Sequence, residues 1–565
     1  MGLSSRWSPS VNTLLPMQSP SYVSGTGATP LIGQTIGDHL DGVAAAHPDN
    51  LCLVSRHQEI RWSYSDFVAE VDRCARAFLA LGVARGDRVG IWAPNRAEWT
   101  VVQYATAKIG AILVNVNPSY RSHELSYALK QSGVSVLVRA EEFKGVSYSE
   151  ILKSIRNEVP QLVTDIGLGE GASDLSWEEF LDRQVAVEEL RSAQSALEFD
   201  DPINIQYTSG TTGNPKGATL THHNILNNGY FVTGIQGLGP GSVLCVPVPL
   251  YHCFGMVMGN LGMLSRGGAV VYPAEAFDPA ATLAAIGEEG CEALYGVPTM
   301  FIAMLDDPSF AEAELATLRT GIMAGSPCPV EVMKRVISDM NMEGVTIAYG
   351  MTETSPVSFQ SRTDDPIDRR VSTVGRIMPH VESKIIDPET ERIVPRSQPG
   401  ELCTRGYSVM RGYWDNPEAT SEAIDDAGWM HSGDLAVMDE EGYVNIVGRI
   451  KDMVIRGGEN VYPREIEEFL YGHPAIADVQ VIGVPDMRYG EELCAWVRLR
   501  EGHQLSLDEL REFCHGRIAN YKIPRYLRVT DEFPLTVTGK VQKFKMREAS
   551  IEELGLAEAA SVRTA

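Results

Sequence analysis

A run of small, polar and basic residues offers the clearest chemistry in this sequence. It spans residues 207–217 and follows the apolar-alternating strand pattern of residues 203–207 directly. Its glycines permit positive φ and close approach, so successive N–H groups can converge on an anion, while the hydroxyls and the lysine add donors and charge. A surface turn also favours Gly, Asn and Pro, but it has no need of four hydroxyls beside a lysine. We therefore predict a phosphate-binding loop.

The loop is not a Walker A sequence, because no G-x-x-x-x-G-K-[S/T] can be read through it and residues 218–220 look like a second strand. It resembles the signature of the adenylate-forming (AMP-binding) superfamily, which includes acyl-CoA synthetases, aryl-CoA ligases, luciferases and peptide-synthetase adenylation domains. Four further motifs of that superfamily follow in the expected order: Tyr349-Gly350-Met351-Thr352-Glu353-Thr354, His431-Ser432-Gly433-Asp434, Gly448-Arg449-Ile450-Lys451-Asp452 and Pro534-Leu535-Thr536-Val537-Thr538-Gly539-Lys540. The resemblance covers nearly the whole chain, from about residue 35 to 548.

The fold class follows from length, pattern and resemblance. A chain of 565 residues is too long for one ordinary core, and 44% hydrophobic with 22% charged residues is a globular composition. Strand and helix signals alternate from residue 35 to about 200, as in a layered α/β domain, whereas residues 371–450 read as short strands of a small β-barrel. We expect a large N-terminal domain of layered α/β sheets plus that barrel, followed by a small mobile α+β C-terminal domain.

The domain boundaries are placed from composition and motifs. Residues 1–34, rich in Ser, Gly and Pro, are expected to be a disordered or loosely attached leader. The large domain takes residues 35–449 and the small one residues 450–565. Several local patterns predict helices, namely the one capped by Ser63-x-x-Asp66 and those at residues 98–109, 255–264, 463–470 and 507–518.

Charge and cysteine usage exclude some classes of function. The net charge of −26 disfavours binding to nucleic acid or to an anionic membrane surface. An anionic substrate therefore needs local positive charge, and late cations form a candidate patch: Arg449, Lys451, Arg456, Arg464, Lys522, Arg525, Lys540, Lys543, Lys545 and Arg547. The nine cysteines lack C-x-x-C pairs and His partners at metal-ligand spacing, which indicates reduced thiols. With no transmembrane segment or signal-peptide core evident, we expect the cytoplasm, or the mitochondrial matrix in a eukaryote.

The resemblance implies that ATP transfers AMP to a carboxylate while pyrophosphate leaves. Such a reaction is limited by bringing two anions together, so it needs positioning and charge stabilisation. The phosphates would be held by Thr208, Ser209, Gly210, Thr211, Thr212, Gly213 and Lys216. Glu353, with Thr208, would bind Mg²⁺, since oxygen ligands suit that ion. The adenosine site would comprise Gly325, Tyr349, Gly350, Thr352, Asp434 and Arg449, with Asp434 accepting from the ribose hydroxyls.

The second half-reaction implied by the resemblance transfers the acyl group to coenzyme A. Lys540 matches the superfamily lysine that reaches the carboxylate and the α-phosphate, and it would act with Glu353, Thr208 and His252 as the catalytic set. The small domain then rotates about Lys451, which matches the hinge position, and Gly457 and Gly458 let the pantetheine arm pass. A plain β-turn is the alternative for those two glycines.

The acid substrate is the least determined part of the reaction. The motif of residues 250–255 places His252 at the mouth of an acyl pocket with Gly255, Val297 and Gly325, and no aspartate there would pair with an amino acid's ammonium group. We expect a fatty acid, because residues 375–379 and 457–463 most resemble those of bacterial and mitochondrial medium-chain acyl-CoA synthetases. The alternatives are an enzyme that loads an acyl or aryl acid onto a separate carrier protein, a luciferase-type oxygenase and an inactive nucleotide-binding protein. A homodimer is left open.

Overall fold

The computed structural model describes residues 19–208, 215–326, 328, 330–457, 459–535 and 541–561. Its helices are α1 Ile36–Ala46, α2 Tyr64–Ala80, α3 Ala97–Ile109, α4 Ser122–Ser132, α5 Tyr148–Ile155, α6 Trp177–Leu181, α7 Val187–Ser195, α8 His222–Ile235, α9 Gly262–Leu264, α10 Pro279–Glu288, α11 Pro298–Leu305, α12 Val330–Asp339, α13 Ile367–Ser372, α14 Pro417–Ala423, α15 Pro463–Leu470, α16 Leu507–Cys514, α17 Lys543–Glu553 and α18 Ala557–Ser561. In the described part of the chain, no helix combines the length and apolar character needed to cross a bilayer.

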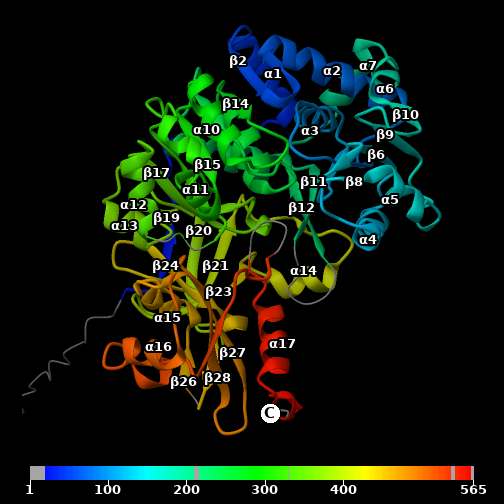
Figure 1. The fold of residues 1–565 in the computed structure, drawn as a ribbon. Coiled ribbons are helices and arrows are strands. Elements are labelled where there is room, and N and C mark those ends of the chain that lie inside the picture. The colour runs from blue at the N-terminus through cyan, green and yellow to red at the C-terminus, as the bar shows by residue number, and fades with distance from the viewer. Residues whose placement is uncertain are drawn as a thin grey trace, which may run out of the picture.

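Two large sheets build the N-terminal part (Figure 1). The eight-stranded sheet runs in the order β10 Leu175–Ser176, β9 Thr164–Gly167, β6 Val136–Arg139, β4 Arg88–Trp92, β5 Ile112–Asn115, β11 Pro202–Thr208, β12 Lys216–Thr221 and β22 Gly412–Tyr413. The nine-stranded sheet runs in the order β19 Arg376–Ile377, β18 Val357–Gln360, β17 Gly344–Gly350, β16 Thr320–Ala324, β15 Ala293–Gly296, β13 Val243–Cys245, β14 Ala269–Tyr272, β2 Leu51–Ser55 and β3 Ile60–Ser63. Both contain a parallel centre. The nine-stranded sheet is antiparallel at both edges and the eight-stranded sheet only at the β12–β22 edge, as in a mixed layered α/β fold.

A third sheet takes the place of the expected small β-barrel. It is antiparallel and five-stranded, in the order β1 Tyr22–Ser24, β20 Val381–Ile386, β21 Gly400–Gly406, β23 Met430–Met438 and β24 Val444–Arg449. Most of its buried side chains join the same hydrophobic cluster as the two large sheets, up to Ile446, while Ile386 and Cys403 form a small separate cluster with Trp429. The large N-terminal part therefore shares one continuous core.

Elements beyond residue 450 form their own core. The strands are β25 Val454–Arg456, β26 Glu459–Val461, β27 Ile476–Asp486, β28 Gly490–Leu499 and β29 Tyr526–Val529, and a separate cluster of buried residues begins at Val454. They lie at the lower end of the molecule in Figure 1, with α15 packed against β24. This α+β arrangement agrees with the expected fold class, while the boundary at residues 449–450 stays a prediction.

Local sequence signals place most elements correctly. Ser63 and Asp66 form the predicted capping box at the start of α2, and α15 has the predicted bounds. The segment predicted as a helix at residues 255–264 is instead a π-helix, η3 Phe254–Leu261, followed by the short α9. A π-helix closes its hydrogen bonds five residues apart, and an apolar run this short does not distinguish that spacing from four.

The expected leader is wrong for residues 19–34. Strand β1 pairs with β20, and Ser21 N donates to Val394 O at 2.9 Å. Further along, the backbone N–H and C=O of Ile32 both bond the side-chain amide of Asn227 on α8, at 2.7 and 3.0 Å. This segment carries no periodic apolar pattern, so its attachment depends on partners that are 195 or more residues away. Residues 1–18 lie outside the described residues.

His222, in the first turn of α8, secures the start of α1, which follows this segment. Its Nδ1 accepts a hydrogen bond from Ile36 N at 3.1 Å, and the side chain is fully buried. Burial lowers the pKa of His222 to about 4, because a buried imidazolium loses its hydration. The ring is therefore a neutral acceptor at neutral pH.

We expect His222 to make the protein less stable in mild acid. Its pKa is about 4 when folded against the ordinary 6.5 of histidine, so between these values the unfolded chain binds a proton that the folded chain does not, and stability falls as pH falls. Between about pH 7 and pH 4.5 the loss is about 2 kcal/mol. Urea unfolding of His222→Gln, which keeps an acceptor for Ile36, should lack this component. His223→Gln, at a half-buried neighbour, should keep it, and an unchanged slope in His222→Gln would contradict the account.

Candidate functional site

The carboxyl ends of three neighbouring parallel strands bring predicted residues to one edge of the nine-stranded sheet. Strands β15, β16 and β17 are paired in parallel and end at Gly296, Ala324 and Gly350. Val297 and Gly325 are the residues that follow the first two ends, and a Cβ on Gly325 would lie 3.1 Å from Val297 Cγ1. Ligands of open α/β sheets bind at such an edge, so Val297, Gly325 and the Tyr349–Thr354 segment are well placed to share one.

The two strands that flank the predicted phosphate loop form an antiparallel pair. Strands β11 and β12 pair in register up to Thr208 and Lys216, and the Thr208 hydroxyl donates to Lys216 O at 3.4 Å. Ser209, Gly210, Thr211, Thr212 and Gly213 lie outside the described residues. The predicted phosphate loop therefore connects the ends of two adjacent strands.

A tyrosine connects this pair to the predicted magnesium ligand. Strand β22 pairs with β12, Ala218 opposite Tyr413, which places the Lys216 Nζ 5.1 Å from the Tyr413 ring centroid. The Tyr413 hydroxyl donates to Glu353 Oε1 at 2.8 Å. Burial, and then the Glu353 carboxylate, raise the pKa of Tyr413, so its phenol stays a donor. Lys216, Tyr413 and Glu353 therefore form a continuous cation, ring and carboxylate chain.

Glu353 is held in a rigid setting. It lies in the 3₁₀ turn η5 Thr352–Thr354, is 6% exposed, and its carbonyl accepts from Met410 N at 2.9 Å. A buried carboxylate with a single hydrogen-bonded tyrosine and a nearby lysine is an arrangement that stabilises a divalent cation or a phosphate–metal complex. The donor set fits Mg²⁺, which prefers oxygen ligands.

The acidic residue predicted to bind ribose is fixed from two sides. Asp434 Oδ2 accepts from the Tyr349 hydroxyl at 2.6 Å, and Asp434 Oδ1 lies 3.2 Å from Arg449 Nε across the β23–β24 pair. Burial, and then Asp434, raise the pKa of Tyr349, which keeps this phenol protonated as well. Asp434, Tyr349 and Arg449 are therefore brought together, as the motifs predict.

Gly350 has a packing reason to be glycine. It sits at the bulge where β17 meets β18, and a Cβ there would lie 1.7 Å from Pro356 O. Met351 comes next and caps η5, so the close approach of these two backbones lies just before the turn that carries Glu353.

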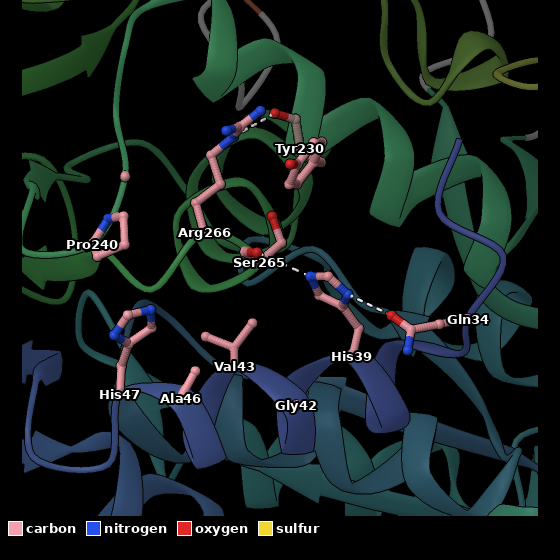
Figure 2. Close-up of a pocket in the computed structure, with 11 residues that line it drawn as sticks. Gln34, His39, Gly42, Val43, Ala46, His47, Tyr230, Pro240, Ser265 and Arg266 are labelled. Carbon is pink, nitrogen blue, oxygen red and sulfur yellow. Dashed lines mark hydrogen bonds between the residues drawn. The ribbon is translucent and has the colours of Figure 1, made fainter. Parts of the chain in front are cut away.

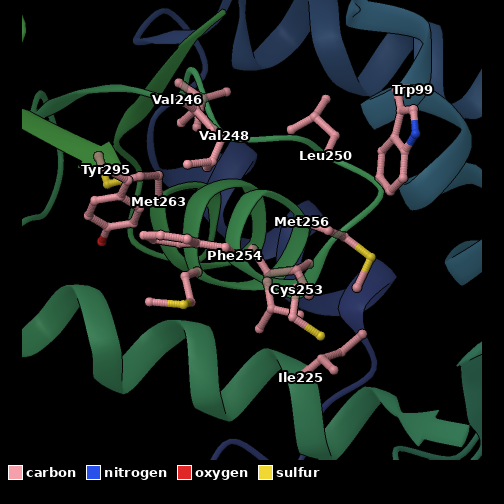
Figure 3. Packing of buried hydrophobic residues seen from close by; sticks show 14 of the residues in the cluster. Trp99, Ile225, Val246, Val248, Leu250, Cys253, Phe254, Met256, Met263 and Tyr295 are labelled. Carbon is pink, nitrogen blue, oxygen red and sulfur yellow. The ribbon is translucent and has the colours of Figure 1, made fainter. Parts of the chain in front are cut away.

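On the substrate side, His252 and Gly255 belong to the start of the π-helix. The His252 carbonyl accepts from Gly255 N at 3.0 Å, and a Cβ on Gly255 would lie 2.4 Å from Pro249 O. The structure therefore gives Gly255 a packing role, and its place in an acyl pocket stays a prediction. Figure 3 shows the apolar setting of this helix, with the Phe254 ring 5.7 Å from that of Tyr295.

The other predicted residues lie in the small C-terminal part or outside the described residues. Lys540 and Gly458 are not described. Lys451 is exposed in the turn η6 Ile450–Asp452, between the last strand of the large part and the first strand of the small one. Gly457, with φ of +61°, forms the β25–β26 turn and donates to Tyr489 O at 2.8 Å. The hinge and the coenzyme A contact stay predictions.

The prediction that the late cations form a patch of local positive charge is wrong. Acidic partners neutralise most of it, through the pairs Arg449–Asp434, Arg456–Glu492, Arg464–Glu468, Lys522–Glu465, Arg525–Asp486, Lys543–Glu467 and Arg547–Glu491. Apart from Arg449 on β24, these cations pair with acidic residues within the small part. The positive charges can be read from the sequence, whereas the acidic residues that face them cannot.

Tyr413 is the site residue that sequence reasoning missed. It is 60 residues from Glu353, in a two-residue strand with too little pattern to be recognised. A hollow of about 510 Å³ runs along β12 and β22, with Thr219 and Tyr413 in its lining. A further pocket of about 440 Å³ lies elsewhere, between α1 and the turn after α9, where Arg266 lies over the Tyr230 ring (Figure 2).

The fold and site are those of a two-part layered α/β protein whose polar site lies at the carboxyl edge of a parallel sheet. The chain belongs to the AMP-binding enzyme family: the model of that family matches residues 40–414, and that of the AMP-binding enzyme C-terminal domain matches residues 465–540.

Relatives and solved structures agree over almost the full length. An acyl-CoA synthetase by name, YngI of Bacillus subtilis (strain 168), is 49% identical over 93% of this chain and 99% of its own. The medium-chain acyl-CoA ligase ACSF2, mitochondrial, of Bos taurus is 44% identical over 96% of this chain and 92% of its own. Among solved structures, ATP-bound MatB from Rhodopseudomonas palustris superposes with a TM-score of 0.79 at 29% identity, covering 92% of this chain and 99% of that one.

Replacing Gly350 by alanine should destabilise the edge that carries Glu353. The added Cβ would meet the Pro356 carbonyl, and backbone on both sides must shift, at a cost of about 1–3 kcal/mol. Gly42→Ala on α1 is the matched control, because nothing lies within 4 Å of its Cβ and alanine favours a helix. Thermal unfolding should show a lower Tm for Gly350→Ala alone. Equal Tm values for both variants would contradict this packing.

Proposed function

We propose that the protein is an ATP-dependent acyl-CoA synthetase. It activates a fatty acid, with medium-chain acids as the preferred class, as an acyl-AMP with release of pyrophosphate, and then transfers the acyl group to coenzyme A. The observation that most supports this is the line of contacts from Lys216 through Tyr413 to Glu353, beside the strand pair that ends at Thr208 and Lys216. The protein is an AMP-binding enzyme, and its relatives are named acyl-CoA synthetase or ligase.

Each group has a role set by charge. Lys216 and the loop from Thr208 neutralise the triphosphate, while the carboxylate of Glu353 holds Mg²⁺, which would supply charge neutralisation to the phosphate oxygens. Asp434 accepts from the ribose hydroxyls, oriented by the bonds from Tyr349 and Arg449. The second half-reaction needs Lys540 to leave and the Gly457 turn to approach, with Lys451 as the hinge. The cytoplasm, or a mitochondrial matrix, stays the predicted location.

A pyrophosphate-release assay separates this proposal from its alternative. Purified protein with ATP and Mg²⁺ receives saturated acids of increasing chain length, each with and without coenzyme A. The proposal predicts release that depends on the acid, peaks at medium chain length, and yields acyl-CoA only when coenzyme A is present. Acid-dependent release that is indifferent to coenzyme A, with no thioester formed, would favour an enzyme that loads a separate carrier protein.

Tyr413→Phe should weaken the use of magnesium and ATP. The variant keeps the ring under Lys216 but removes the donor to the Glu353 carboxylate, and a hydrogen bond to a charged group contributes about 1.5–3 kcal/mol. We expect KM for Mg·ATP to rise on the order of tenfold while KM for the acid changes little. Tyr443→Phe is the control, because that hydroxyl donates to Asp365 at 2.7 Å, away from the site. Equal effects in both variants would contradict a role of the Tyr413 hydroxyl in the use of Mg·ATP.

Lys540→Ala should separate the two half-reactions. Loss of this cation is expected to abolish formation of the acyl-adenylate while leaving thioester formation from supplied acyl-AMP largely intact. Both steps are followed in single-turnover assays. Lys545→Ala, an exposed lysine on α17, is the matched control and should retain both steps. Equal loss of both steps in Lys540→Ala would contradict the assigned role.

Lys451→Pro should show the opposite pattern. Proline fixes φ at the turn between the two parts and restricts the residue before it, so rotation of the small part is hindered. We expect adenylate formation to be spared and thioester formation to fall on the order of tenfold. Lys451→Ala keeps the backbone freedom and should retain both rates. Wild-type rates of both steps in the proline variant would show that Lys451 is not the hinge.

A further inference from the structure

Three side chains of different chemistry converge beside Asp434. Glu401 and Cys403 extend from β21, and His431 extends from the neighbouring β23, with Cys403 directly opposite His431 in the register. One ligand atom from each lies within 4.8 Å of the others, and in the described part of the chain no other three His, Cys, Asp or Glu residues meet this closely. Twenty-eight residues separate the cysteine from the histidine, so sequence spacing gave no sign of a ligand pair.

The distances match the ligand shell of a zinc ion. His431 Nδ1 lies 3.0 Å from Glu401 Oε2 and 3.7 Å from Cys403 Sγ. Tetrahedral zinc, with bonds of about 2.0 Å to nitrogen or oxygen and about 2.3 Å to sulfur, separates N from O by about 3.3 Å and N from S by about 3.6 Å. The two distances from His431 therefore lie within tenths of an ångström of those around a tetrahedral ion, and the Glu401 and Cys403 ligand atoms lie within 4.8 Å of each other. A water molecule could take the fourth position, since His431 is partly exposed.

The surroundings supply the outer partners that metal ligands use. Asp425 Oδ2 lies 3.9 Å from His431 Nε2, on the far side of the ring, where a carboxylate commonly orients a ligating histidine. Glu401 Oε1 accepts from Gly433 N at 3.1 Å, which fixes the second carboxylate oxygen. Lys384 and Arg405 both lie over the Trp429 ring, at 4.6 and 4.4 Å, and Arg405 is paired with Glu382. The Glu401 carboxylate and a Cys403 thiolate balance a dication, and Asp425 balances Lys384.

We propose that Glu401, Cys403 and His431 form a site for one zinc ion. The ion takes the place of the proton shared between His431 and Glu401 and that of the Cys403 thiol, so binding releases protons. Because Glu401 also holds Gly433 N, the bound ion clamps β21 to β23 one residue before Asp434. Borderline-soft Zn²⁺ suits this mixed nitrogen, sulfur and oxygen set, whereas Mg²⁺ does not.

Cobalt(II) spectroscopy on the full chain tests the site directly. Chelator-treated wild-type protein is titrated with Co²⁺ alone under inert gas. We expect a thiolate-to-cobalt charge-transfer band and visible d–d bands that saturate at one Co²⁺ per chain and disappear when Zn²⁺ is added. A wild-type spectrum without the charge-transfer band would overturn the proposal and needs no variant to interpret.

Two cysteine variants assign the sulfur. Cys403→Ala should lose the charge-transfer band, with Cys403→Ser as the second variant if the alanine form does not fold. Cys328→Ala should keep the band, and it is the stringent control because Cys328 is the one partly exposed cysteine while the other eight are buried. Zn²⁺ should also raise the Tm of the wild type and of Cys328→Ala but not that of Cys403→Ala. A band that survives in Cys403→Ala or vanishes in Cys328→Ala would contradict the assignment.

Discussion

The pairing of β22 with β12 is the contact on which the site depends. It is a short antiparallel pairing, yet it brings residues from three distant stretches of the chain into one line, from Lys216 through Tyr413 to Glu353. Strand β12 also contacts η5, the turn that carries the buried carboxylate, and β22 adds Tyr413 as the link between Lys216 and Glu353. Because Glu353 is buried, its charge needs both a fixed donor and nearby positive charge, and this pairing provides the two together.

The second anchor is the edge formed by parallel strands. Strands β15, β16 and β17 end at the same edge of the sheet. Gly350 allows its backbone to approach Pro356 O where a Cβ would clash, and Gly325 has a φ of +90°, which favours glycine. Asp434, held by Tyr349 from β17 and Arg449 from β24, joins this edge to the five-stranded sheet. The site is therefore positioned by strand ends and buried phenols, which suits groups that must meet a charged ligand without rearranging.

Sequence patterns determined the local elements better than the long-range ones. The capping box of Ser63, the helix α15 and the strands β11 and β12 follow from short-range chemistry, and the structure has them. The motif residues Tyr349, Asp434 and Arg449 also meet as expected. Strand β1 pairs across about 360 residues, and its three residues carry too little pattern to announce a partner.

The wrong or missed predictions concern residues whose interaction partners are distant in the sequence. The late cations were visible in the sequence, but the acids that neutralise them come from other strands and helices. Tyr413 was missed because its importance comes from the bond to Glu353 rather than from its neighbours in sequence. No cysteine has a Cys or His partner at metal-ligand spacing along the sequence, whereas Cys403 and His431 become neighbours only across paired strands.

The central claim is that one nucleotide spans the line from Lys216 and Glu353 to Asp434. A structure determined with ATP and Mg²⁺ bound tests it most directly. The account predicts the triphosphate at the end of the β11–β12 pair, the metal on the Glu353 carboxylate and the ribose hydroxyls on Asp434. A nucleotide bound elsewhere, with Lys216, Glu353 and Asp434 all without contact to it, would contradict the account.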